Sequence, residues 1–85
     1  MPEHHGRLKQ ARELVASSQY SDSLPHYQTL IDASQLLEET RGDLRQLVDQ
    51  NPADPRLRRL LGDTHMRLGD LQSALDTYRS ALDQL

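Results

Sequence analysis

The side chains of this sequence that could carry out chemistry are its four histidines and the carboxylates near them. His4 and His5 are adjacent, while His26 and His65 stand far apart, so no two histidines have the i, i+4 spacing that presents two imidazoles to one metal ion. Asp22 and His26 have that spacing, which could orient the imidazole as a general base, but no nucleophile or anion-binding loop is recognisable beside them. We therefore expect no enzyme activity, no catalytic residue, no metal and no cofactor.

The net charge and the missing residue types narrow the classes of partner. Ten Lys and Arg stand against thirteen Asp and Glu, a formal net charge of −3, which is too acidic for a protein whose affinity comes from neutralising phosphates. The chain has no apolar run long enough for a membrane span or a signal sequence, and it has no cysteine. These features predict a cytoplasmic protein that binds neither nucleic acid nor membrane.

Composition and periodicity predict an all-α fold. With 85 residues, 35% of them hydrophobic and 4% aromatic, the chain can build only a thin core, which suits stacked helices better than a closed sheet. Apolar residues recur at helical spacing in five segments separated by short polar stretches. The expected helices are residues 7–18, 22–33, 35–50, 55–68 and 71–84. We expect them to form a single domain over residues 7–85, preceded by a flexible N-terminus of residues 1–6.

Cap and breaker residues mark the boundaries of several of these helices. Asp54 can cap the helix that Pro55 begins, and Gly69 can adopt the left-handed conformation that ends it. Asp70 is then placed to cap the final helix, and so short a turn makes the last two helices antiparallel. Earlier in the chain, Pro25 is tolerated in the first turn of its helix, so we expect that helix to begin no more than a few residues before it.

Residues 54–85 resemble the tetratricopeptide repeat, whose unit of about 34 residues is a pair of antiparallel helices. The residues that carry the resemblance have packing and turn roles, and they are Leu61, Gly62, Gly69, Ala74, Tyr78 and Ala81. Gly62 and Ala74 lack bulk where the two helices approach closely, and Tyr78 fills the space around them. The sequence departs from the family at Arg58, where Trp is frequent, and at His65, where Tyr is usual.

Two repeat phases fit residues 7–50, where the resemblance is weak. If the sequence is shifted by about one repeat length, Tyr27 and Ile31 align with Leu61 and His65 of the last hairpin. In a competing phase, residues 18–20 form the turn of a repeat and Tyr27 belongs to its second helix. Either phase implies a right-handed stack of five helices in antiparallel hairpins, about two and a half repeats of an α-solenoid.

The resemblance also implies a function, namely a non-catalytic module that binds a peptide or a helix of a partner protein. Family members bind such segments in a groove lined by the first helix of each repeat. In this sequence the groove residues are expected to be Arg56, Arg59, Asp63, Met66 and Arg67. Arginines near a helix N-terminus oppose the helix dipole, so their presence there indicates either an acidic partner or a solvated charged face with Asp54 and Asp63 nearby.

An alternative function is structural self-assembly into a homodimer or higher homo-oligomer. Helical arrays need polar caps at their ends, but the final expected helix keeps an apolar stripe through Leu75, Leu82 and Leu85. Under this alternative, a second copy of the chain covers that stripe, or the apolar face of the first expected helix.

Overall fold

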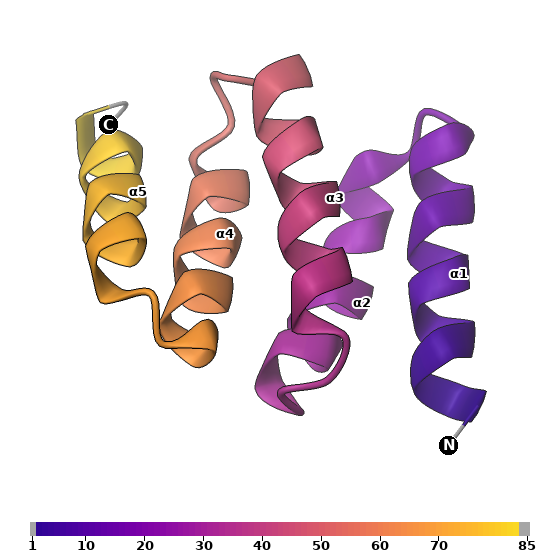
Figure 1. Ribbon diagram of the computed structural model, residues 1–85. Coiled ribbons are helices and arrows are strands. Elements are labelled where there is room, and N and C mark those ends of the chain that lie inside the picture. Colours follow the sequence, from indigo (N-terminus) through magenta and orange to yellow (C-terminus); the bar gives the residue numbers. More distant parts are fainter. Residues whose placement is uncertain (1, 84–85) are drawn as a thin grey trace. The chain divides into compact units, whose positions relative to one another are not determined.

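The computed structural model describes residues 2–83, which form five α-helices and the short connections between them (Figure 1). The helices are α1 (Pro2–Ala16), α2 (Tyr20–Asp32), α3 (Leu37–Gln50), α4 (Pro55–Leu68) and α5 (Leu71–Asp83). No strand occurs among the described residues, which confirms the all-α class. The chain has two compact units, Met1–Leu36 and Leu37–Leu85, which are described separately.

The first unit is an antiparallel hairpin of α1 and α2. Its turn is a Schellman motif, in which the N–H of Gln19 donates to the carbonyl of Leu14 (2.8 Å) and Ser18 lies in the left-handed region (φ 62°). The turn forces α2 back along α1, which is why the two helices pack against each other. The buried apolar residues of this unit are Leu8, Ala11, Leu24, Tyr27, Leu30 and Ile31.

Helix α1 begins earlier than the sequence predicts. It starts at Pro2, whose missing N–H costs nothing at the first position of a helix, and Glu3 in the first turn complements the helix dipole. Residues 2–6 therefore belong to α1 in the structure. The local signals were present in the sequence, but the absence of large apolar residues between Pro2 and Leu8 concealed them.

Helix α2 also begins earlier, at Tyr20, so that Pro25 lies in its second turn rather than its first. Two hydrogen bonds close the first turn ahead of the proline. The N–H of Asp22 donates to the carbonyl of Gln19 (3.0 Å), and the hydroxyl of Ser23 donates to the carbonyl of Tyr20 (2.5 Å). The helix therefore starts on its own local bonds before it reaches the residue that lacks a donor.

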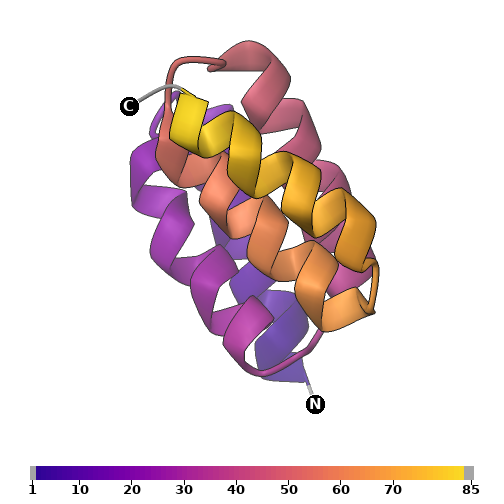
Figure 2. The ribbon, with the colours of Figure 1, turned by 90° about the vertical axis from the view of Figure 1, so that its left-hand side faces the viewer.

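In the second unit, α4 packs against both α3 and α5, and consecutive helices run antiparallel (Figure 1; Figure 2 views the unit from the side of α5). Helix α3 begins at Leu37 rather than residue 35, because Ser34 and Leu36 both lie in the left-handed region (φ 53° each). Gly42 lies within α3 without ending it. The buried residues of the unit are Thr40, Leu44, Leu47, Leu57, Leu60, Leu61, Gly62, Thr64, His65 and Ala74.

Helix α4 has the caps that its sequence predicts. The Asp54 carboxylate accepts a hydrogen bond from the N–H of Arg56 (3.1 Å), and Pro55 follows as the first helical residue. At the other end Gly69 is left-handed (φ 82°). The Asp70 carboxylate then accepts a bond from the N–H of Ser73 (3.2 Å) and caps α5. These bonds set the tight antiparallel turn between α4 and α5.

The two hairpins share a spacing of small, turn and aromatic residues. The set in the last hairpin is Gly62, Gly69, Ala74 and Tyr78, and the set at the same separations in the first is Ala11, Ser18, Ser23 and Tyr27. Ser18 and Gly69 are both left-handed, and Ala11, Ser23 and Ala74 are all fully buried. The structure therefore favours the phase in which residues 18–20 form the turn of a repeat.

We predict that Gly62→Ala and Gly42→Ala change the free energy of unfolding in opposite directions. A Cβ on Gly62 would lie 2.5 Å from Cε1 of Tyr78, so the ring must move, at a cost of about 1–3 kcal/mol. A Cβ on Gly42 meets nothing within 4 Å, so the better helix propensity of Ala should stabilise α3 by about 1 kcal/mol. Urea unfolding followed by circular dichroism measures both changes, and a Gly62→Ala variant as stable as Gly42→Ala would contradict the close contact.

Candidate functional site

One face of α4 is exposed, and it carries the five residues expected to line a partner groove. Arg56, Arg59, Met66 and Arg67 are exposed, and Asp63 is half-buried. We call these five residues the α4 strip. The rest of the helix is mostly buried, at Leu57, Leu60, Leu61, Gly62, Thr64 and His65. The strip is therefore one narrow surface on a helix whose other faces pack inside the unit.

Tyr78 of α5 reaches the edge of this strip. Its hydroxyl donates a hydrogen bond to Oδ1 of Asp63 (2.5 Å), and its ring lies against Gly62. Burial, together with the hydrogen-bonded Asp63 carboxylate, raises the pKa of Tyr78 to about 12, so the phenol stays neutral and remains a donor at physiological pH. Asp63 thus has a partner within the hairpin, which explains an acidic residue in a strip of Arg and Met.

Arg56 is compensated within the protein. Its guanidinium forms a two-point ion pair with the Asp54 carboxylate, with Nε 3.0 Å from Oδ1 and NH2 2.8 Å from Oδ2. The same carboxylate caps α4, so its charge offsets both the arginine and the orphan N–H groups of the first turn. Arg58 donates to the carbonyl of Pro52. The crowding of arginines at this helix end is therefore partly explained without an acidic partner, and of the strip residues near this end only Arg59 is left to be explained.

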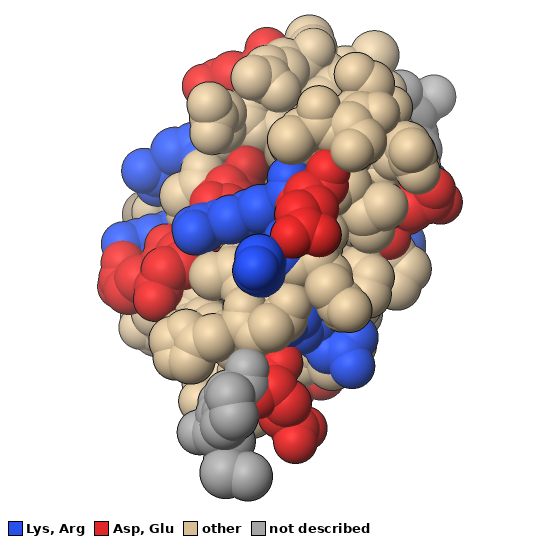
Figure 3. Space-filling model, turned by 90° about the vertical axis from the view of Figure 1, so that its right-hand side faces the viewer, with Lys and Arg blue, Asp and Glu red and all other residues tan. Residues whose placement is uncertain are grey.

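Among the helices of the second unit, positive charge is concentrated on α4. This helix carries four arginines and one aspartate, whereas α3 carries four acidic residues and two arginines, and α5 carries two aspartates and one arginine. On the side of the chain where α1 lies, basic and acidic side chains are interspersed (Figure 3). The α4 strip is thus the surface of the second unit that attracts negative charge.

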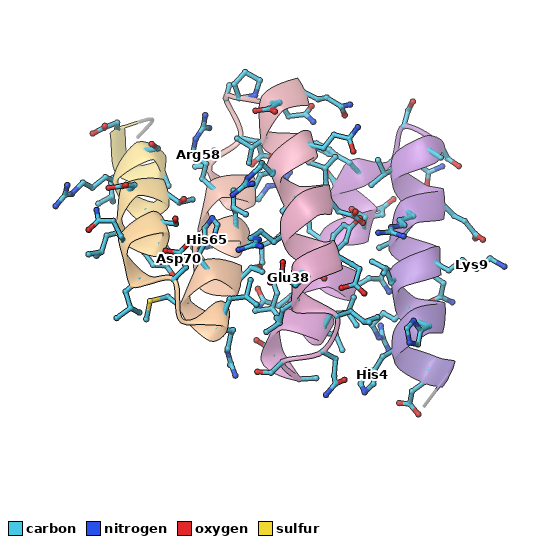
Figure 4. The ribbon with its side chains drawn as sticks, viewed as in Figure 1. His4, Lys9, Glu38, Arg58, His65 and Asp70 are labelled. Atoms are coloured by element: carbon cyan, nitrogen blue, oxygen red, sulfur yellow. The ribbon has the colours of Figure 1, made fainter. Side chains whose placement is uncertain are left out.

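Among the described residues of the second unit, two buried side-chain atoms have no hydrogen-bond partner. They are Nδ1 of His65 on α4 and Oγ1 of Thr40 on α3. His65 is only 2% exposed, and this burial lowers the pKa of its imidazole. The Asp70 carboxylate, in the turn that follows α4 (Figure 4), raises this pKa, and the charges of Arg45 and Arg41 on α3 lower it. The imidazole is therefore held neutral, and protonating it opposes folding.

His26 contacts an arginine in the structure, where its spacing from Asp22 suggested a carboxylate partner. In the first unit, NH1 of Arg7 lies 3.1 Å from Nδ1 of His26, a bond in which the guanidinium donates and the imidazole nitrogen accepts. His26 is therefore oriented by an arginine, which the sequence reasoning missed, and not by Asp22. The described residues contain no group of three or more His, Asp or Glu side chains that could bind a metal.

The face expected to support self-association lies on α5. Leu75 and Leu82 are exposed, at 52% and 66%, and Leu85 lies outside the described residues. Leu71, at 57%, belongs to the same surface and was not predicted, although it stands four residues before Leu75 on the helix. The repeat-like residues lie inside the hairpin or at its turn: Leu61, Gly62 and Ala74 are buried, Tyr78 and Ala81 are half-buried, and Gly69 makes the turn.

Comparison with known proteins identifies a family. A family model described as tetratricopeptide repeat matches residues 37–85, more than half of the chain, and spans α3, α4 and α5. No curated protein and no solved structure matches the chain. Among the described helices, none has the length and apolar character needed to cross a bilayer.

We predict that His65 destabilises the second unit in mildly acidic solution. Because the fold lowers the pKa of His65 below its ordinary value of 6.5, the unfolded chain binds this proton more readily than the folded chain. The contribution of neutral His65 to stability is complete above about pH 6.5 and is lost as the pH falls below that value. Each unit of pKa depression corresponds to about 1.4 kcal/mol.

Urea unfolding of the parent and of His65→Leu between about pH 7.5 and pH 5 tests this assignment. Leu binds no proton, so the stability of His65→Leu should fall less than that of the parent as the pH is lowered. His5→Gln, at an exposed position of α1, is the control and should follow the parent. Parallel pH profiles for the parent and His65→Leu would contradict the role of His65.

Proposed function

Because this chain belongs to the tetratricopeptide repeat family, whose members generally mediate protein–protein interactions, we propose that it is a non-catalytic module that binds a partner protein through the α4 strip. The ligand is a peptide or a helix of that partner. The family match confirms the resemblance carried by residues 54–85. We propose the cytoplasm as the compartment, as the sequence predicts, and a partner that is neither nucleic acid nor membrane.

The observation that carries this proposal is that all five expected groove residues share one face of one helix. Both ends of α4 are capped, by Asp54 and Gly69, and Tyr78 holds Asp63 from the neighbouring helix. A strip held in this way loses little conformational freedom of its backbone when a ligand binds.

The strip's chemistry favours an acidic ligand with an apolar side chain. Arg59 and Arg67 are exposed and can donate to carboxylates, while Met66, at 48% exposure, offers a flexible apolar contact on the same face. Arg56 contributes its charge together with Asp54 as a pair. An acidic peptide with one apolar residue therefore matches the strip better than a basic one.

Self-assembly is a second candidate function, and the exposure of Leu75 and Leu82 on α5 favours it. Large apolar side chains that stand together on one helix face commonly mark an interface. This candidate uses different residues from the α4 strip, so the two functions are compatible.

We predict that the double variant Arg59→Glu, Arg67→Glu binds acidic peptides about tenfold more weakly than the parent, or worse, because two attractive charges become repulsive. Fluorescence anisotropy measures this with labelled synthetic peptides in which Asp and Glu flank a central Leu. The same peptides with Lys in place of Asp and Glu should show the reverse preference. Arg56 is left unchanged, because its loss would also remove the partner of the α4 cap.

A matched charge reversal on α1, Lys9→Glu with Arg12→Glu, controls for the change in net charge. Both residues are exposed and belong to the first unit, so this control should bind like the parent. Equal binding by the parent and the strip variant, or an equal loss in the control, would argue against the α4 strip as the binding site.

A further inference from the structure

The large apolar side chains that stay exposed in the described residues all belong to the α4–α5 hairpin. They are Met66 (48%), Leu71 (57%), Leu75 (52%) and Leu82 (66%). Three of them lie on α5, where Tyr78 between Leu75 and Leu82 is half-buried. We call Leu71, Leu75, Tyr78 and Leu82 the α5 stripe. Ala74, on a neighbouring face of α5, is fully buried, so the stripe extends the packed face of the helix towards solvent.

The spacing of the α5 stripe is symmetric. Its positions are separated by steps of four, three and four residues, which is the alternation found at the packed positions of a coiled coil. The order of these spacings is therefore the same in both directions along the helix. In an antiparallel pair of identical helices, Leu71 faces Leu82 of the second copy, and Leu75 lies at the level of Tyr78, whose ring packs on Gly62 and leaves only its exposed part for the contact.

The charges beside the α5 stripe suit the same arrangement. Asp76 and Arg79 are exposed on the polar face of α5, and Asp76 accepts a hydrogen bond from Nε2 of Gln72 (3.1 Å) on that face. In the antiparallel register, Arg79 is two residues, about 3 Å along the axis, from the level of Asp76 in the second copy. Because the dimer has two-fold symmetry, this opposite-charge pair forms twice.

We propose that α5 is a homodimer interface, in which the α5 stripe packs antiparallel against the α5 stripe of a second copy and Arg79 pairs with Asp76 across the dimer. The inference rests on the self-assembly candidate and adds its partner, orientation and register. We infer that a second copy covers the stripe, because the apolar spacing and the flanking charges of α5 both complement those of an identical helix running in the opposite direction. An unrelated helix has no reason to satisfy both.

Sedimentation velocity and light scattering over about 1 µM to 1 mM protein test the interface. The parent should shift with concentration from its chain mass of 9.7 kDa to twice that value. Leu75→Asp should remain at 9.7 kDa throughout and keep its circular dichroism spectrum, because Leu75 is exposed. Ala16→Asp, at an exposed position of α1, is the control and should associate like the parent.

Two single charge reversals test the register. Arg79→Asp places two carboxylates opposite each other, and Asp76→Arg places two guanidinium groups opposite each other, so each variant alone should dimerise about tenfold more weakly. In an equimolar mixture the heterodimer restores both opposite-charge pairs. The mixture should therefore associate with nearly the parental dissociation constant.

Each possible outcome contradicts a different part of the proposal. A parent that stays at 9.7 kDa throughout the series overturns self-assembly itself. A dimer that survives Leu75→Asp overturns the α5 stripe as its interface. A dimer that depends on Leu75 but is not restored in the charge-reversed mixture overturns the antiparallel register and leaves self-assembly standing. None of these results bears on peptide binding by the α4 strip, which the variants leave intact.

Discussion

The last hairpin depends on the contact between Gly62 and Tyr78. A Cβ on residue 62 would stand 2.5 Å from the tyrosine ring, so the ring occupies space that any side chain would take. This close approach lets α5 pack on α4 with Ala74 fully buried, and it brings the tyrosine hydroxyl to Asp63. The glycine thereby determines both how the two helices meet and how one edge of the α4 strip is held.

The features that sequence reasoning predicted well are those that depend on few, nearby residues. Asp54, Pro55, Gly69 and Asp70 act on the backbone within one turn, so their roles can be read without knowing the rest of the fold. Helical periodicity also separates the exposed positions of α4 from its buried face, whereas a partner groove at these positions stays a prediction drawn from the family resemblance. The early starts of α1 and α2 were missed because proline and short polar side chains can begin a helix before any apolar residue marks it.

Other features depend on side-chain orientations and on contacts between helices, which a single sequence does not determine. Arg56 can point to solvent, to a ligand or to Asp54, and only the structure shows the two-point ion pair. His65 is polar by type, yet it lies at 2% exposure because its position in the repeat faces the interior, and its Nδ1 is left without a partner. The contact of Arg7 with His26 joins residues from different helices and has no signature in local spacing.

The two candidate surfaces of the α4–α5 hairpin differ in the physics of their contacts. The α4 strip attracts through exposed charges, so its interactions weaken as salt screens them. The α5 stripe gains from removing leucines from water, which salt does not weaken in this way. Each dimer formed through α5 would carry two α4 strips in a fixed two-fold relation. A partner with two acidic segments could then bind both strips, and the second contact would form at the high effective concentration created by the first.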